Sequence, residues 1–322
     1  MKKLLSVLLV LCIVLSFASC GKAEPTEARV FVINGPTGIG AVNMMEAAKQ
    51  GLTEGKYAFN VVTNPSDIVA KLSNGEADIA AIATNLASNV YNTSGGKITV
   101  LAVNTLGVLN ILVNTGTEIN SAEDLKGKTI YTTGKDNNPE YVINYLASKS
   151  GIDLQKDVTI NYVAEGTALV PVWETNPEAI IIAPQPVASS ILAKYQGSKI
   201  AVDLTDVWEQ VGESSALMQG CVVVRNDFLK ENPEAVELFL KEYGASIEKC
   251  STDLDGTAAL CEQYGIVAKA ALAKKAIPNC NICFVTGSEM KTKLSGYLSV
   301  LFAANPKSIG GKLPSDDFYY EK

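Results

Sequence analysis

Residues 64–85 read NPSDIVAKLSNGEADIAAIATN, and this stretch decides the fold class. Residues 64–67 supply cap residues and a proline for a helix start, and Gly75 supplies the glycine that closes a helix. Residues 77–83 form a short run of mostly alanine and isoleucine, which predicts a strand buried on both faces. The stretch therefore predicts one helix and one strand of an α/β unit, followed by a polar loop at Thr84.

The same alternation continues on both sides of this stretch, in two series. The first series has expected strands at 29–34, 59–63, 98–103 and 109–114, and a helix at 39–52. The second has strands at 129–132, 158–163, 179–183 and 200–204, with helices at 138–149, 168–174 and 185–195. A strand at 221–225 and helices at 233–249 and 289–303 follow. Such alternation predicts mainly parallel sheets covered by helices.

Two series predict an α/β protein of two lobes, each a mainly parallel sheet flanked by helices, with a cleft between them. We expect lobe I to comprise residues 28–117 plus 222–322, because the C-terminal segment returns to complete it. Lobe II is expected to comprise residues 118–221.

The N-terminal segment has the pattern of an export signal. Lysines at positions 2 and 3 precede an apolar run over residues 4–17, and small residues precede Cys20. The alternative interpretation is a membrane-spanning helix. Such a helix needs about 20 residues, and this run is shorter. Residues 17–20 (FASC) resemble the lipobox of bacterial lipoproteins, which implies a signal peptide at 1–19 and lipid on Cys20. Residues 20–27 are predicted to form the tether of this lipid anchor, on the extracytoplasmic face of the cell membrane.

The composition excludes several kinds of function. The 322 residues carry a net charge of −7 and no basic stripe, which argues against nucleic acid as a partner. The chain has no histidine, the commonest metal ligand and triad base. Arg29 and Arg225 are its only arginines, so we expect no arginine to contact a ligand. No metal, no cofactor and no enzymatic activity are expected.

Five cysteines remain after Cys12 and Cys20 are set aside: Cys221, Cys250, Cys261, Cys280 and Cys283. Export favours disulfides, and Cys250 with Cys261 is one candidate pair, while the pairing of the five cysteines is left open. Cys280 and Cys283 have the CxxC spacing of redox or metal sites. Because they border a strand-like run, we favour a structural role as small apolar residues.

Four loops follow expected strands and have the character of ligand contacts. Ligands of open α/β sheets bind beyond the carboxyl ends of the strands, where helix N-termini offer free N–H groups and about half a positive charge. The candidate residues are Gly35, Pro36, Thr37 and Gly38; Thr84 and Asn85; Thr133 and Gly134; and Gln185. The alternative for each loop is an ordinary turn or helix cap.

Several of these segments together resemble the type II periplasmic binding proteins of ABC importers. They are the lipobox, the loop at 34–38, and the segments at 68–80, 121–130 (SAEDLKGKTI) and 222–236 (VVVRNDFLKENPEAV). The match lies in the branch that includes nitrate, sulfonate, taurine and thiamine-precursor binders. Many relatives carry Glu where this chain has Gln185.

The resemblance implies a monomer whose lobes close on a small solute, a sulfonate- or taurine-like anion or a thiamine-precursor-like heterocycle. The hinge crossings would lie near residues 117–121 and 218–221. The closed form would then dock on permease subunits that work with a cytoplasmic ATPase. A sensor that signals to a membrane receptor is the alternative function. A same-fold enzyme of thiamine pyrimidine synthesis is disfavoured, because that enzyme depends on an active-site histidine.

Overall fold

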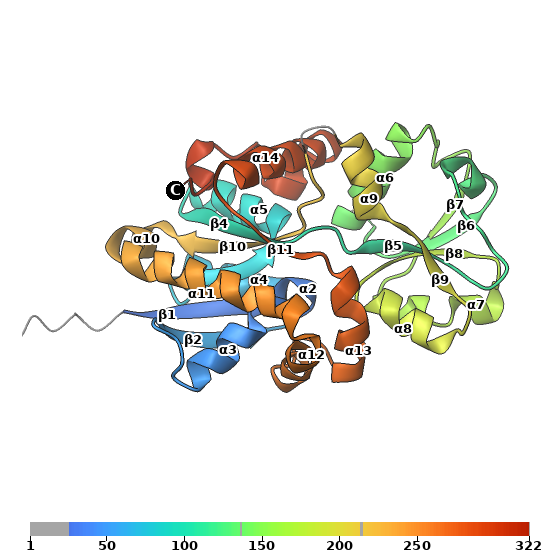
Figure 1. Cartoon of the computed structure of the whole chain (residues 1–322). Coiled ribbons are helices and arrows are strands. Elements are labelled where there is room, and N and C mark those ends of the chain that lie inside the picture. Colours follow the sequence, from blue (N-terminus) through green and yellow to red (C-terminus); the bar gives the residue numbers. More distant parts are fainter. Residues whose placement is uncertain (1–25, 136, 213–214, 322) are drawn as a thin grey trace, which may run out of the picture.

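The strands of the protein form two sheets that lie side by side (Figure 1). The computed structural model describes residues 26–135, 137–212 and 215–321. The first sheet has the order β11-β4-β10-β3-β1-β2, and the second has the order β7-β6-β8-β5-β9. The strands of the first sheet are β1 (Glu27–Ile33), β2 (Lys56–Val62), β3 (Ile79–Ala83), β4 (Ile98–Thr105), β10 (Gly220–Arg225) and β11 (Ile282–Val285). Those of the second are β5 (Leu109–Val113), β6 (Thr129–Thr132), β7 (Thr159–Tyr162), β8 (Ile180–Pro184) and β9 (Lys199–Asp203).

Both sheets are mixed, with most strands running in one direction. Strand β1 pairs parallel with β2 and β3, whereas β10 inserts antiparallel between β3 and β4, and β11 pairs antiparallel with β4. In the second sheet β6 pairs parallel with β7 and β8, and β5 lies antiparallel between β8 and β9. The predicted α/β fold, with two mainly parallel sheets flanked by helices, is confirmed.

Helices cover both faces of each sheet, so the sheets are buried between apolar layers. One face of the first sheet packs against α3 (Val42–Lys49), α11 (Pro233–Thr252), α12 (Leu254–Gln263) and α13 (Ala270–Ala276). The other packs against α4 (Pro65–Ser73), α5 (Thr84–Ser94) and α14 (Gly287–Ala304). The second sheet lies between α6 (Asn138–Lys149) with α9 (Leu204–Val211) and α7 (Val172–Thr175) with α8 (Val187–Lys194).

Local sequence explains where these elements begin. Helix α4 starts as predicted, because the Asn64 side chain accepts a hydrogen bond from the Ser66 N–H and Pro65 occupies the first turn. The helix expected at 39–52 is the shorter α3, and the expected loop at 34–38 contains an additional short helix, α2 (Pro36–Ile39). The chain turns at Gly40, where a Cβ atom would lie 2.9 Å from Ile247 Cγ1 of the packed helix α11. Gly40 therefore allows the close approach of α11.

The first crossing between the lobes lies earlier than the sequence predicts. Lobe I was expected to reach residue 117, with the crossing near 117–121. Strand β5 instead forms hydrogen bonds with β8 and β9 of the second sheet. The chain therefore crosses at Leu106 to Val108, directly after β4, and returns to the first sheet at β10. The local sequence of 109–113 gives no sign of which sheet the strand joins, because an apolar run suits the centre of either.

The five described cysteines are free thiols, so the candidate Cys250–Cys261 disulfide is not formed. Both residues are buried in the apolar layer beneath α11 and α12, where cysteine packs as a small apolar side chain. Cys250 Sγ lies 3.8 Å from the Ile39 carbonyl oxygen and 3.7 Å from that of Ser246. Within the described part of the chain, no three His, Cys, Asp or Glu side chains form a group that could hold a metal ion.

The N-terminal predictions lie mostly outside the described residues. The signal peptide at 1–19 and Cys20 belong to the part of the chain that is not described. Glu27, expected as the end of the tether, is the first residue of β1. Among the described helices, none combines the length and the apolar character that a membrane crossing needs.

Candidate ligand-binding site

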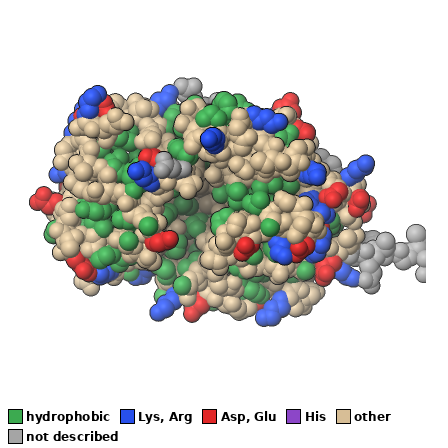
Figure 2. All heavy atoms as spheres, turned by 180° about the vertical axis from the view of Figure 1, so that it is seen from behind, with side chains coloured by type: hydrophobic (Ala, Val, Ile, Leu, Met, Phe, Trp, Pro, Cys, Tyr) green, Lys and Arg blue, Asp and Glu red, His purple; other side chains and the backbone are tan. Residues whose placement is uncertain are grey.

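A cavity of about 390 Å³ lies where the two lobes meet, at the carboxyl ends of the parallel strands. Its walls come from both lobes and from the crossing segments. The described residues that line it are Pro36, Thr37, Pro65, Ala83, Asn85, Leu86, Thr105, Val108, Asn137, Asn138 and Gln219. Figure 2, seen from behind, shows the hollow between the lobes, with hydrophobic and other uncharged groups on its walls. The cavity has the position at which open α/β sheets bind ligands.

The described lining of this cavity carries no charged side chain. Its electrostatics come instead from helix N-termini. Pro65 is in the first turn of α4, Asn85 and Leu86 are in the first turn of α5, and Asn138 starts α6. The N-terminus of each helix presents free N–H groups and partial positive charge, so the cavity suits an anion or a ligand with electronegative atoms.

Three of the predicted contact residues line the cavity: Pro36, Thr37 and Asn85. Gly35, which precedes α2, and Gly38, within α2, shape the segment that presents Pro36 and Thr37. Gly35 has φ 92° and donates its N–H to the Ile266 carbonyl at 2.9 Å, a backbone conformation that favours glycine. A Cβ atom on Gly38 would lie 2.3 Å from the Ile33 carbonyl oxygen, so only glycine fits there.

Thr84 and Gln185 use their side chains inside the protein. The Thr84 hydroxyl donates to the Met218 carbonyl at 2.6 Å and is fully buried. Gln185 donates from Nε2 to Asn110 Oδ1 at 3.0 Å, and its Oε1 accepts from the Ser189 hydroxyl at 2.8 Å. Both residues therefore hold loops in place and are absent from the cavity lining.

Thr133 and Gly134 lie in the turn before α6 and are likewise absent from the cavity lining. Gly134 has φ 77°, and its carbonyl accepts from the Asn137 N–H at 3.1 Å. A Cβ atom at this position would lie 2.6 Å from Pro139 Cγ. Gly134 thus permits the turn that brings Asn137 and Asn138 to the cavity.

The sequence prediction missed Asn137, Asn138 and Gln219, which line the cavity. It also missed Asn104, which is 1% exposed and donates to the Thr37 carbonyl at 2.9 Å. Asn137 and Asn138 stand at the predicted start of a helix, where asparagine is typical of a cap. Their position after a strand of lobe II was the signal that could have identified them.

Contacts between the lobes also reach the cavity. Helix α14 of the first lobe packs against α6 of the second. The Tyr297 hydroxyl of α14 donates to Asn138 Oδ1 at 2.8 Å, and Asn305 Nδ2 donates to the Tyr141 hydroxyl at 2.8 Å. Burial raises the pKa of the Tyr297 phenol, which keeps it a neutral donor. A cavity residue of one lobe is therefore held by a side chain of the other.

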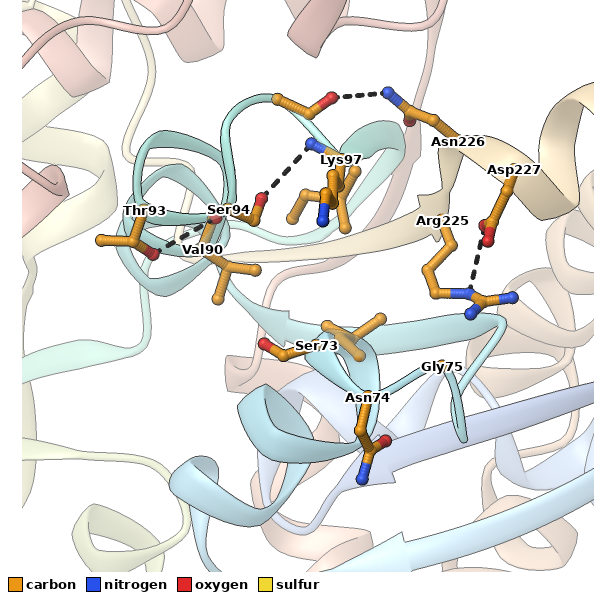
Figure 3. A pocket seen from close by; sticks show the side chains of 13 residues that line it. Ser73, Asn74, Gly75, Val90, Thr93, Ser94, Lys97, Arg225, Asn226 and Asp227 are labelled. Atoms are coloured by element: carbon orange, nitrogen blue, oxygen red, sulfur yellow. Dashed lines mark hydrogen bonds and ion pairs between the residues drawn. The ribbon is translucent and has the colours of Figure 1, made fainter.

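A second cavity of about 690 Å³ lies at the opposite edge of the first sheet (Figure 3). Helices α4 and α5 end there, and helix C-termini carry partial negative charge. Lys97 and Arg225 line this cavity, and Figure 3 shows the ion pair from Arg225 to Asp227. Arg225 also pairs with the buried Asp78, which favours a structural role for this arginine.

Both arginines are engaged at this edge, away from the cavity between the lobes. Asp78 is 2% exposed and accepts from Arg29 Nε at 2.8 Å and from Arg225 at 3.3 Å. Hydrogen bonding to Asp78 raises the pKa of Arg29. The two guanidinium groups therefore stabilise a buried carboxylate inside the first lobe.

The chain is similar to known proteins in sequence and in fold. A family model described as NMT1/THI5 like matches residues 56–253, and no curated protein matches the chain. The crystal structure of an ABC transporter protein from Parabacteroides distasonis is 25% identical, with a TM-score of 0.77 over 92% of this chain and 99% of that one. The periplasmic aliphatic sulphonate-binding protein SsuA of Escherichia coli is 13% identical, with a TM-score of 0.71 over 92% and 93%.

A third solved structure shares the fold at a greater distance. It is a Candida albicans gene product described as having the generic periplasmic binding protein fold. It is 16% identical, with a TM-score of 0.55 over 91% of this chain and 93% of that one. The fold is therefore that of the type II periplasmic binding proteins.

Proposed function

The chain belongs to the NMT1/THI5-like family, and from this premise we propose that it is the substrate-binding lipoprotein of an ABC importer. The observation that carries the proposal is the uncharged cavity between the lobes, lined from both of them. A solute bound there contacts both lobes only when they are together. Ligand binding would therefore favour the closed state through its extra contacts.

The proposed ligand is a small solute that presents electronegative atoms to helix N-termini. A sulfonate- or taurine-like anion fits, because three sulfonate oxygens can accept from the N–H groups of α5 and α6 without an arginine. A thiamine-precursor-like heterocycle is the second candidate, because Asn85, Asn138 and Gln219 can pair with ring nitrogens and amino groups. One similar protein is named for binding aliphatic sulphonates, which supports the first candidate.

Export and anchoring complete the proposal. A lipid on Cys20 would hold the protein at the outer face of the cell membrane, and the following residues would link it to β1. Tethering raises the local concentration of the binding protein near its permease. The closed form would deliver the solute to permease subunits driven by a cytoplasmic ATPase.

The ligand class can be tested on a version that starts after Cys20. Native mass spectrometry of the purified protein would detect a co-purified ligand. A thermal-shift panel would then compare taurine, ethanesulfonate, sulfate and 4-amino-5-hydroxymethyl-2-methylpyrimidine. Asn85→Ala should remove the shift of a binding compound, and Asn60→Ala, an exposed change on β2 outside the cavity, should retain it. A shift that survives Asn85→Ala and Asn138→Ala would refute the site.

Two other functions can be distinguished from import by experiment. A sensor would bind the same solute but would leave uptake intact when its gene is deleted. An enzyme would form product in a turnover assay with the purified protein. Loss of uptake in the deletion strain, restored by the wild-type chain, is the outcome we expect.

A further inference from the structure

Asn281 stands out in the backbone, because it is the non-glycine residue with positive φ among the described residues, at 47°. Asparagine tolerates this left-handed conformation better than most residues, but it remains uncommon and marks positions that the surroundings fix. Asn281 lies between Cys280 and the edge strand β11, so its flanks belong to the first lobe. It is one of the two residues between Cys280 and Cys283 in the CxxC segment.

The side chain of Asn281 reaches the other lobe. Its Nδ2 donates to the Gly107 carbonyl at 2.8 Å and lies 3.1 Å from Thr205 Oγ1 and 3.4 Å from Asp203 Oδ2. Gly107 is in the first crossing between the lobes. Asp203 ends β9 and caps α9 of the second lobe, accepting from the Thr205 N–H at 2.8 Å. A single amide thus joins the first lobe, the crossing and the second lobe.

The backbone around this amide is packed closely. The Asn281 carbonyl accepts from the Leu106 N–H at 3.0 Å, which ties the same residue to the crossing a second time. A Cβ atom on Gly107 would lie 2.4 Å from both Leu217 Cδ2 and Thr205 Oγ1. Leu217 belongs to the returning crossing and is fully buried. The two crossings and Asn281 therefore meet in one cluster.

The cysteines on either side do not account for this arrangement. Cys280 is fully buried, and Cys283 Sγ lies 3.7 Å from the Val103 carbonyl oxygen. Burial raises the pKa of the Cys283 thiol to about 12, so a reactive thiolate is disfavoured at neutral pH. What the segment presents to the other lobe is the asparagine amide.

We propose that Asn281 is a positioning residue for ligand capture. Its side chain links the first crossing to the second lobe and thereby sets the angle between the lobes. The proposal rests on the proposed function, since it concerns how the cavity is formed. The bonds to Asp203 and Thr205 span the lobes beside the crossing, so they favour the lobe angle at which all three acceptors lie within reach of the amide. The bond to Gly107 fixes the crossing about which such a rotation would turn.

The test measures the distance between the lobes without any ligand. Spin labels on Leu52→Cys in the first lobe and Lys156→Cys in the second report the distance distribution by double electron–electron resonance. Both side chains are well exposed, at 73% for Leu52 and 81% for Lys156. Asn281→Asp keeps the shape but turns the donor into a carboxylate facing Asp203 and the Gly107 carbonyl. Asn281→Gly keeps the backbone conformation and removes the side chain.

We expect both variants to populate a longer distance, with the open fraction rising about tenfold. Adding Asp203→Asn to Asn281→Asp should reverse part of the shift, because the amide introduced on β9 can donate to the new carboxylate and still cap α9, whereas the bond to Gly107 stays lost. Asn279→Asp is the matched control, since Asn279 bonds only to Lys275 of its own lobe in the described structure. An unchanged distribution in Asn281→Gly, or an equal shift in Asn279→Asp, would overturn the proposal. Because no ligand is used, this result is independent of the ligand panel.

Discussion

Replacing Tyr297 by Phe removes one hydroxyl that connects the lobes at the ligand cavity. Tyr297 is fully buried, its ring packs against Trp208 with centroids 5.4 Å apart, and its hydroxyl donates to Asn138 Oδ1 at 2.8 Å. The phenylalanine ring keeps the packing, so the loss is that of the hydrogen bond alone. A net bond contributes about 1 kcal/mol, and a buried carbonyl left without a partner costs about 1–3 kcal/mol.

We expect the lower part of that range for Tyr297→Phe, about 1–2 kcal/mol, because Asn138 lines a cavity that water can enter. Urea unfolding followed by circular dichroism would measure the free energy of unfolding. A double-mutant cycle with Asn138→Ala would isolate the bond, with a coupling of about 1 kcal/mol expected. In the same variant the Asn138 amide is free to rotate, so the affinity for a compound found in the panel should fall as well.

The control for this prediction is Tyr319→Phe. Tyr319 is also buried, and its hydroxyl has no side-chain hydrogen bond among the described residues. Its replacement should change the free energy of unfolding by less than about 0.5 kcal/mol. If Tyr297→Phe destabilised the wild type and Asn138→Ala equally, the two residues would be uncoupled and the reasoning would be refuted.

Three further predictions concern charge and titration. Arg225→Ala should destabilise the first lobe by about 1–3 kcal/mol, because Asp78 loses one of its two partners, while the affinity for a panel compound stays within twofold. A large loss of affinity in a folded Arg225→Ala protein would contradict our assignment of the site. The free energy of unfolding should fall as pH rises above about 10, the pKa of tyrosine in the unfolded chain. The reason is that burial and the bond to Glu46 raise the pKa of Tyr264 in the folded protein to about 12, so the folded state keeps this phenol protonated. Melting temperatures that stay level from pH 9 to pH 12 would argue against this. In the version that starts after Cys20, the native thiols should react slowly with a disulfide reagent at pH 8, since burial raises the pKa of Cys250 and Cys261 to about 12, and all five should react after unfolding. Rapid reaction of the folded protein would contradict the buried positions.

Residues 64–85 illustrate how much of the fold is local. The cap at Asn64, the closing glycine and the buried strand after it are signals within a few residues of the elements that they define. The predicted α4 and β3 therefore match the structure closely. The same holds for α6, which the sequence placed at 138–149.

Non-local partners explain what could not be predicted. Strand β5 joins the second sheet because β8 and β9, about 70 and 90 residues later, accept it at its edges. The sequence predicted that Thr84 and Gln185 contact the ligand. In the structure their side chains form hydrogen bonds with Met218 and Ser189 instead. Asn138 looked like a cap and is instead a cavity residue, held by Tyr297 from 159 positions away.

The absence of charge in the described cavity lining has a consequence for how binding and closure are coupled. A long arginine side chain could hold an anion from one lobe while the other moved. Here the electropositive groups are helix N-termini, whose field falls off within the first turn. The N-termini of α4 and α5 belong to one lobe and that of α6 to the other. An anion can therefore be held by all of them only when the lobes stand at one angle. Affinity in such a site should depend on lobe position more steeply than in an arginine-lined cleft, and residues outside the cavity that fix this angle, Asn281 first among them, should influence affinity as strongly as those that line it.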